Sequence, residues 1–135
     1  MDFNDTPEQA KFRAQCREWL EANAELKDSQ SMDHIGESSL EEHLEIAKKW
    51  QKKKYDAGWA MLHWPKEYGG TDWTVTQRYI FDEECGAASA PSVLPFGVTM
   101  VAPVIIKYGT KEQKDFYLPK ILSTEHWWCQ GYSEP

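Results

Sequence analysis

The chain has 135 residues, a length that suits one domain with a modest core. Its net charge of −7 argues against non-specific nucleic-acid binding, which needs cations that neutralise phosphates, and against a polybasic role at a membrane surface. Three widely spaced cysteines without a Cys-x-x-Cys pair argue against a disulfide framework or a zinc knuckle. The N-terminus lacks the regions of a signal peptide, and no apolar run is long enough to span a membrane, so we expect a cytoplasmic protein.

The first two predicted helices each begin at a capping box. Residues 6–9, Thr-Pro-Glu-Gln, predict a helix that ends near Ala24. Cys16 falls on its apolar stripe, which favours a small core residue over a reactive thiol. Residues 39–42, Ser-Leu-Glu-Glu, predict the start of a second helix that stops at Gly58.

An aromatic connector, residues 59–70, follows the second helix. Pro65 interrupts regular structure, and the pair of glycines at 69 and 70 provides a turn. A loop of this kind is held by side chains that pack inward, so we expect Trp59 and Trp64 to be largely buried. We interpret His63 as a packed or hydrogen-bonded residue, because no partner lies at metal-ligand spacing from it.

The third predicted helix begins with a capping box at Thr74. Its apolar residues, from Val75 to Ala88, cover more than one stripe, which indicates burial on more than one side. The acidic triplet 82–84 could suggest acid–base chemistry. Consecutive helical residues point in different directions, however, so a solvent-exposed face with one inter-helix ion pair is the better interpretation.

The most hydrophobic stretch, residues 96–108, predicts a fourth helix in which Pro103 causes a kink or occupies the first turn. Such a helix could line an acyl or flavin pocket, although core packing is its commoner use. A capping box at Thr110 begins a fifth helix, which we expect to stop at Pro119.

These patterns predict an all-α fold, a bundle of about five helices, whose last residues look like the start of a β-strand. No Gly-x-Ser-x-Gly, His-Glu-x-x-His or phosphate-binding glycine loop occurs. We therefore predict no catalytic residue and no metal site in these residues.

Four short motifs, in order and at similar spacing, resemble the acyl-CoA dehydrogenase family. Residues 64–70, Trp-Pro-Lys-Glu-Tyr-Gly-Gly, are similar to its W/F-P-x-x-Y-G-G connector, and residues 109–114 to its G-T/S-x-E-Q-K junction. Residues 116–121 resemble the Y/F-L-P-x-I/L that follows. Residues 132–135, Tyr-Ser-Glu-Pro, resemble the opening of its flavin signature. The tail and the first helix are most similar to bacterial members, such as the large subunits of pimeloyl-CoA-type dehydrogenases.

The resemblance implies that residues 1–126 form the family's N-terminal helical domain and that residues 127–135 begin its flavin-binding β-domain. The implied activity is FAD-dependent α,β-dehydrogenation of an acyl-CoA, with electrons passed to an electron-transfer flavoprotein and the protein working as a homo- or hetero-oligomer. The catalytic carboxylate of the family matches no residue in the chain, so we expect these residues alone to be inactive and to retain no FAD. The alternative is a non-enzymatic interaction module, or a pseudo-subunit that completes a partner's site.

The family's motifs also imply contact residues by position. The cofactor contacts are Gln130, Tyr132 and Ser133, with the Ser133 hydroxyl bonded to the pyrimidine side of the flavin. The acyl substrate contacts are Leu94, Phe96, Thr99 and Met100.

Overall fold

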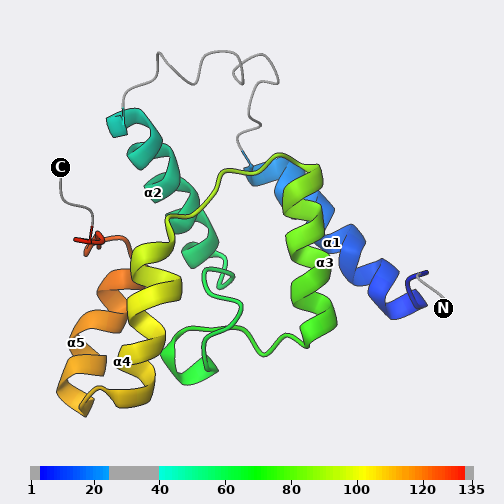
Figure 1. The fold of residues 1–135 in the computed structure, drawn as a ribbon. Coiled ribbons are helices and arrows are strands. Elements are labelled where there is room, and N and C mark those ends of the chain that lie inside the picture. The colour runs from blue at the N-terminus through cyan, green and yellow to red at the C-terminus, as the bar shows by residue number, and fades with distance from the viewer. Residues whose placement is uncertain (1–3, 25–39, 133–135) are drawn as a thin grey trace. The chain divides into compact units, whose positions relative to one another are not determined.

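The computed structural model describes residues 4–24 and 40–132. The chain divides into two compact units, and each is described by itself. The first consists of Met1–His43 and Trp73–Pro91, and the second of Leu44–Asp72 and Ser92–Pro135. The described residues form five α-helices and no strand, which confirms the predicted all-α class (Figure 1).

Helices α1 (Pro7–Asn23) and α3 (Val75–Ala87) form the first unit and lie side by side (Figure 1). Both predicted capping boxes are present: the hydroxyls of Thr6 and Thr74 accept hydrogen bonds from the backbone of the third helical residue, and the glutamine there bonds back. The core between the helices is apolar and aromatic. Its members include Cys16, Leu20, Ile80 and Phe81.

Of two predictions for this unit, one is confirmed and one is wrong. Cys16 is 0% exposed, and burial raises the pKa of its thiol to about 11, which confirms its role as a core residue. The prediction that α3 is buried on more than one side is wrong, because Val75 and Tyr79 are 77% and 60% exposed. The buried residues of α3 are Ile80, Phe81 and Glu84, which lie on one helix face.

The acidic triplet of α3 supplies an inter-helix ion cluster. Glu84 is buried and accepts hydrogen bonds from Arg13 at 3.1 Å and from Arg17 at 2.9 Å, both on α1. Arg13 also contacts Asp5 at 2.6 Å and Glu83 at 3.0 Å. The predicted ion pair is confirmed, and it is a cluster that ties α1 to α3.

The second unit contains α2 (Leu40–Asp56, from Leu44 onward), a 3-10 turn η2 (Lys66–Tyr68), the π-helical turn η3 (Phe96–Val101), α4 (Ala102–Tyr108) and α5 (Lys111–Leu122). The predicted capping box at Ser39 lies outside the described residues, whereas the box at Thr110 is present. The core of the unit joins the connector, the fourth and the fifth helical segments. It consists of Ala60, Met61, Trp64, Val98, Ala102, Leu118, Ile121 and Leu122.

The aromatic connector is held by one buried tryptophan. Trp64 is 5% exposed, as predicted, whereas Trp59 is only partly buried, because the core positions are taken by the residues after it. The Pro65 carbonyl accepts hydrogen bonds from the amides of Tyr68 and Gly70, which closes the turn. A Cβ on Gly70 would lie 1.7 Å from the Trp64 carbonyl oxygen, so only glycine fits there.

The fifth helix continues through Pro119 to Leu122, so the prediction that it stops at Pro119 is wrong. Proline inside a helix removes one backbone hydrogen bond. Here the loss falls in the last turns, and Leu118, Ile121 and Leu122 are buried on either side of it. Packing of these side chains outweighs the local penalty of the proline.

Candidate functional site

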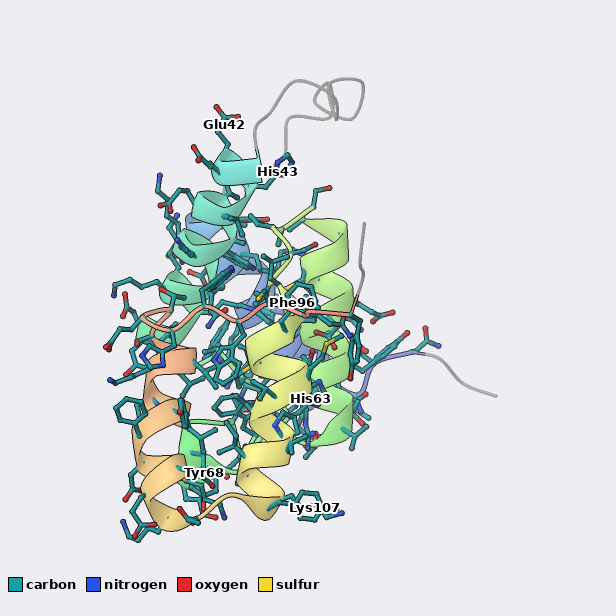
Figure 2. The ribbon with its side chains drawn as sticks, turned by 60° about the vertical axis from the view of Figure 1, so that its left-hand side comes forward. Glu42, His43, His63, Tyr68, Phe96 and Lys107 are labelled. Carbon is teal, nitrogen blue, oxygen red and sulfur yellow. The ribbon has the colours of Figure 1, made fainter. Side chains whose placement is uncertain are left out.

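The candidate site is built on η3, the turn that precedes α4. In Figure 2, Phe96 lies near one end of the continuous η3–α4 segment and Lys107 near the other. The Ala102 amide donates to the Gly97 carbonyl, five residues back, which is the π-helical pattern. Pro103 follows immediately and has no amide hydrogen to donate. The predicted interruption at Pro103 is therefore present and takes the form of a π turn.

The four predicted substrate residues lie on or just before this turn but face different surroundings. Leu94 and Phe96 are partly buried. Thr99 is exposed, and its hydroxyl donates to the Pro95 carbonyl at 2.9 Å. Met100 is 48% exposed. The π turn thus gathers the four residues into one short segment, while their role toward a substrate stays a prediction.

A groove of about 350 Å³ opens beside the turn, and Thr99 is part of its wall. Pro103 and Ile106 of α4 continue that wall, since residues spaced by four and seven lie on one helix face. The opposite side is formed by the aromatic connector, through Met61, His63, Trp64 and Pro65. This groove has the apolar lining with a few polar groups that ligand sites share.

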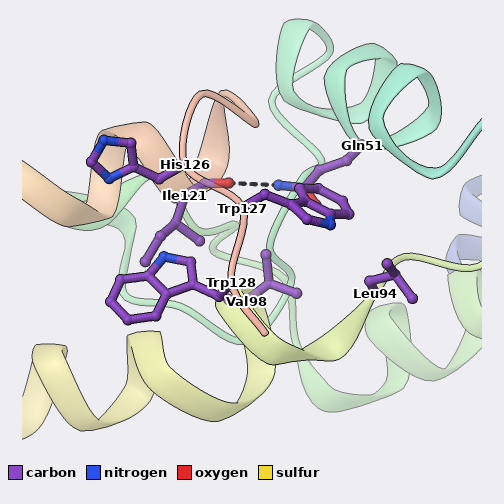
Figure 3. Close-up of a pocket in the computed structure, with 8 residues that line it drawn as sticks. Gln51, Leu94, Val98, Ile121, His126, Trp127 and Trp128 are labelled. Atoms are coloured by element: carbon purple, nitrogen blue, oxygen red, sulfur yellow. Dashed lines mark hydrogen bonds between the residues drawn. The ribbon is translucent and has the colours of Figure 1, made fainter. Parts of the chain in front are cut away.

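A second, much smaller cavity lies where the tail meets the turn, and Leu94 is part of its lining (Figure 3). Its volume of about 10 Å³ is room for roughly one water molecule. Trp128 packs against Gly97, and its indole nitrogen is buried without a hydrogen-bond partner among the described residues. Beside it, the buried Gln51 side chain donates to the carbonyls of Ile121 and Leu122 at 2.7 and 3.2 Å.

The tail carries the predicted flavin contacts. Residues 127–132 form no strand in the part of the chain that the structure describes. Gln130 and Tyr132 are exposed there, Tyr132 at 84%. Ser133 lies outside the described residues. Both described side chains are therefore available to a partner surface, and their contact with FAD stays a prediction.

The described residues offer no obvious acid–base pair at the groove. His63 is exposed on its edge and is the titratable side chain in its lining. Within residues 4–24 and 40–132, no group of three or more His, Cys, Asp or Glu side chains could hold a metal ion. None of the described helices is long and apolar enough to cross a membrane.

Sequence reasoning missed three residues that shape this region. Gln51 lies among the lysines of α2 in sequence, yet it is 1% exposed and its amide donates to the Ile121 carbonyl at the end of α5. Nothing in the sequence of the tail marks the Trp128 indole nitrogen as a buried donor without a hydrogen-bond partner among the described residues. Trp64 was predicted to be buried, but its bond to the Val98 carbonyl at 2.9 Å was not. The hydrogen bonds of Gln51 and Trp64 join residues that are 34 or more positions apart in sequence. The burial of the Trp128 nitrogen can be seen only in the structure.

The described residues combine capped helices with an apolar groove beside an interrupted fourth helix. Comparison with known families gives the class: residues 6–125 match the family described as "Acyl-CoA dehydrogenase, N-terminal domain". The chain belongs to the acyl-CoA dehydrogenase family. The predicted resemblance to this family is thereby confirmed.

Several relatives support membership of the acyl-CoA dehydrogenase family. The chain is 41% identical over 127 residues to acyl-CoA dehydrogenase IpdE1 of Mycolicibacterium smegmatis, covering 93% of this chain and 32% of that protein. It is 34% identical to acyl-CoA dehydrogenase FadE26 of Mycobacterium tuberculosis, covering 100% of this chain and 33% of that protein. The chain thus spans about a third of the length of the curated relatives that it matches.

Solved structures agree in fold. The Mycobacterium tuberculosis ChsE4-ChsE5 complex contains a chain that matches with a TM-score of 0.68 and 34% identity, over 100% of this chain and 32% of that one. The structure of the Tcur3481-Tcur3483 steroid ACAD matches with a TM-score of 0.61 and 29% identity, over 91% of this chain and 30% of that one.

Proposed function

We propose that this chain is the acyl-pocket domain of an FAD-dependent acyl-CoA dehydrogenase, which oxidises the α,β carbon–carbon bond of an acyl-CoA thioester. The observation that carries the proposal is the family match over residues 6–125, which includes the interrupted helix and the groove that Thr99 helps to line. Leu94, Phe96, Thr99 and Met100 would contact the acyl chain. Their mixture of apolar side chains and one hydroxyl suits a hydrocarbon chain near its thioester.

The cofactor would meet this chain at its tail. The Gln130 amide and the Tyr132 phenol are exposed and offer hydrogen-bond donors and a ring face, which fits the polar edge and plane of a flavin. Ser133 would complete the set. FAD supplies the acceptance of hydride from the β-carbon when it is bound. This chain would orient the acyl group and cover one side of the reacting bond, while a carboxylate base outside it takes the α-proton.

Assembly and electron transfer are also part of the proposal. One structural relative, ChsE4-ChsE5, is a complex, which supports a homo- or hetero-oligomer here. An electron-transfer flavoprotein would reoxidise the flavin, and the site of action would be the cytoplasm. Because another structural relative is a steroid ACAD, bulky acyl-CoA thioesters belong among the test substrates.

A second candidate function is a non-enzymatic module that completes a partner's site. Two observations favour keeping it: the groove offers no acid–base pair among the described residues, and a structural relative is a complex. In that case the chain would bind an acyl group or a partner surface without contributing to a flavin site.

The two candidates differ in flavin chemistry. The holoenzyme, meaning the FAD-loaded protein with this chain as its N-terminal domain, should lose its flavin absorption when an acyl-CoA is added without oxygen. The 135-residue chain alone should be colourless and inactive. An oxidised flavin that no acyl-CoA bleaches would favour the binding module, and bound FAD with turnover in the 135-residue chain alone would contradict the proposed division of labour.

A further inference from the structure

The buried tryptophan of the connector does more than fill the core. We propose that Trp64 is a positioning residue for the acyl pocket: its indole N–H holds the turn Phe96–Val101 in π-helical register and so determines which side chains of that turn face the acyl chain. The inference rests on the proposed function for its substrate, and on backbone hydrogen bonding for its mechanism.

The backbone of the turn leaves one carbonyl without its normal donor. In π register the Ala102 amide bonds to Gly97, so the next carbonyl, that of Val98, would take its donor from residue 103. Residue 103 is proline and has no N–H. Val98 is 4% exposed, so water does not readily replace the missing donor. The Trp64 indole nitrogen donates to this carbonyl at 2.9 Å and takes the place of the missing amide.

The α-helical alternative would not need the indole. In α register the Ala102 amide would bond to the Val98 carbonyl, and Pro103 would leave the carbonyl of Thr99 unpaired instead. Thr99 is exposed, so water could serve that carbonyl. The indole bond is therefore the interaction that favours the π register over the α register at this turn.

The indole is itself held in place. Trp64 is 5% exposed within the core of the second unit. Its own carbonyl lies against Gly70, where no side chain fits, and the neighbouring Pro65 carbonyl closes the turn on Tyr68 and Gly70. The aromatic connector thus fixes the donor through contacts that do not involve the π turn.

The register has a direct consequence for the pocket. A π turn contains one more residue than an α turn, and one residue corresponds to a rotation of about 100° around the helix. In the observed register, Thr99 joins Pro103 and Ile106 in the wall of the groove, whereas Met100 lies on a face with the exposed Val104 and Tyr108. A change of register would rotate Leu94 and Phe96 relative to these faces.

The first test isolates the donor in the full 135-residue chain. Replacing Trp64 with β-(3-benzothienyl)alanine keeps the shape of the indole and exchanges its N–H for sulfur; Trp64→Phe is a simpler second variant. Scalar couplings across hydrogen bonds, measured by NMR, report which carbonyl the Ala102 amide contacts. We expect the coupling to move from Gly97 in the wild type to Val98 in both variants. The same replacement at Trp59, in the same connector, should leave the coupling of the Ala102 amide at the Gly97 carbonyl.

The second test measures selectivity in the holoenzyme. With the Trp64 isostere, the ratio of kcat/KM between a long and a short acyl-CoA should change about tenfold, through KM of the long substrate, because a displaced pocket wall misplaces the longer chain. The matched control is the same replacement at Trp59, which does not line the groove and should leave this ratio, the flavin spectrum and kcat for the short substrate within about twofold of the wild type.

The outcomes separate the claims. An Ala102 coupling that stays at Gly97 in the Trp64 isostere overturns the register mechanism. A coupling that moves while the selectivity ratio stays constant overturns the role in specificity. A wild-type holoenzyme whose flavin no acyl-CoA reduces overturns the proposed function, and the specificity role with it, while the NMR result still decides whether Trp64 sets the register.

Discussion

The ion cluster between α1 and α3 gives the sharpest stability prediction. Glu84 is 6% exposed at its side chain and accepts three hydrogen bonds, one from Arg13 at 3.1 Å and two from Arg17, each at 2.9 Å. Substitution Glu84→Gln keeps the shape and removes the charge. A hydrogen bond to a charged group contributes about 1.5–3 kcal/mol, but Arg17 is 59% exposed and therefore partly screened. We expect the free energy of unfolding to fall by about 2 kcal/mol.

Urea unfolding followed by tryptophan fluorescence measures this loss as a lower midpoint at an unchanged slope. Glu83→Gln is the matched control, because Glu83 is adjacent, 41% exposed and contacts Arg13 at 3.0 Å. This control substitution should lower the free energy of unfolding by less than about 0.5 kcal/mol, because exposed ion pairs contribute little to stability. Equal losses for the two variants would refute the argument that burial makes the Glu84 contacts strong.

The same cluster predicts the pH dependence. Hydrogen bonds from Arg17, and then from Arg13, lower the pKa of Glu84 below its ordinary value of 4.5 despite its burial. Arg13 likewise lowers the pKa of Asp5. A lowered pKa in the folded state means that the stabilisation is complete above the ordinary value and is lost as the pH falls through the folded value. The wild type should lose stability below about pH 4.5 more steeply than Glu84→Gln, and parallel profiles would contradict this assignment.

Three further predictions concern other parts of the chain. Gly70→Ala should lower the free energy of unfolding by about 2–4 kcal/mol, because its Cβ would overlap a backbone carbonyl. Gly86→Ala, with open space in α3, should raise the free energy of unfolding by about 0.5–1 kcal/mol. Thermal unfolding tests both variants, and a neutral Gly70→Ala would contradict the predicted overlap. Gln51→Leu should cost about 1–3 kcal/mol in urea unfolding, since two carbonyls at the end of α5 lose their donor, and a loss near zero would show that water replaces the amide. A thiol reagent at about pH 8 should modify the exposed Cys129 in seconds to minutes and Cys16 only on unfolding, as mass spectrometry of the labelled peptides would show; equal rates would contradict the burial of Cys16.

Features that depend on neighbours in sequence were predictable. The capping boxes at Thr6, Thr74 and Thr110 are all formed, because each joins residues three positions apart. Burial of Cys16 and the ion pair of the acidic triplet followed from helical periodicity.

Features that depend on contacts between residues distant in sequence were not predictable. Pro119 lies inside α5 because buried neighbours outweigh its local preference, which no local rule could weigh. The interruption at Pro103 was predicted, but its π register depends on a donor 34 residues away from Val98 in sequence. The candidate contacts Leu94, Phe96, Thr99 and Met100 came from resemblance, and the structure adds that Thr99 and Leu94 line two separate cavities.

A hybrid protein tests directly whether this domain serves a flavin-dependent dehydrogenase. Residues 6–125 of this chain can replace the matching domain of the Mycolicibacterium smegmatis relative, which is 41% identical to it, and the flavin spectrum of the hybrid can be followed while acyl-CoA is added without oxygen. We expect the flavin band to bleach, as in the parent enzyme. A hybrid that folds and holds FAD, yet stays oxidised with every acyl-CoA that reduces the parent, would contradict it.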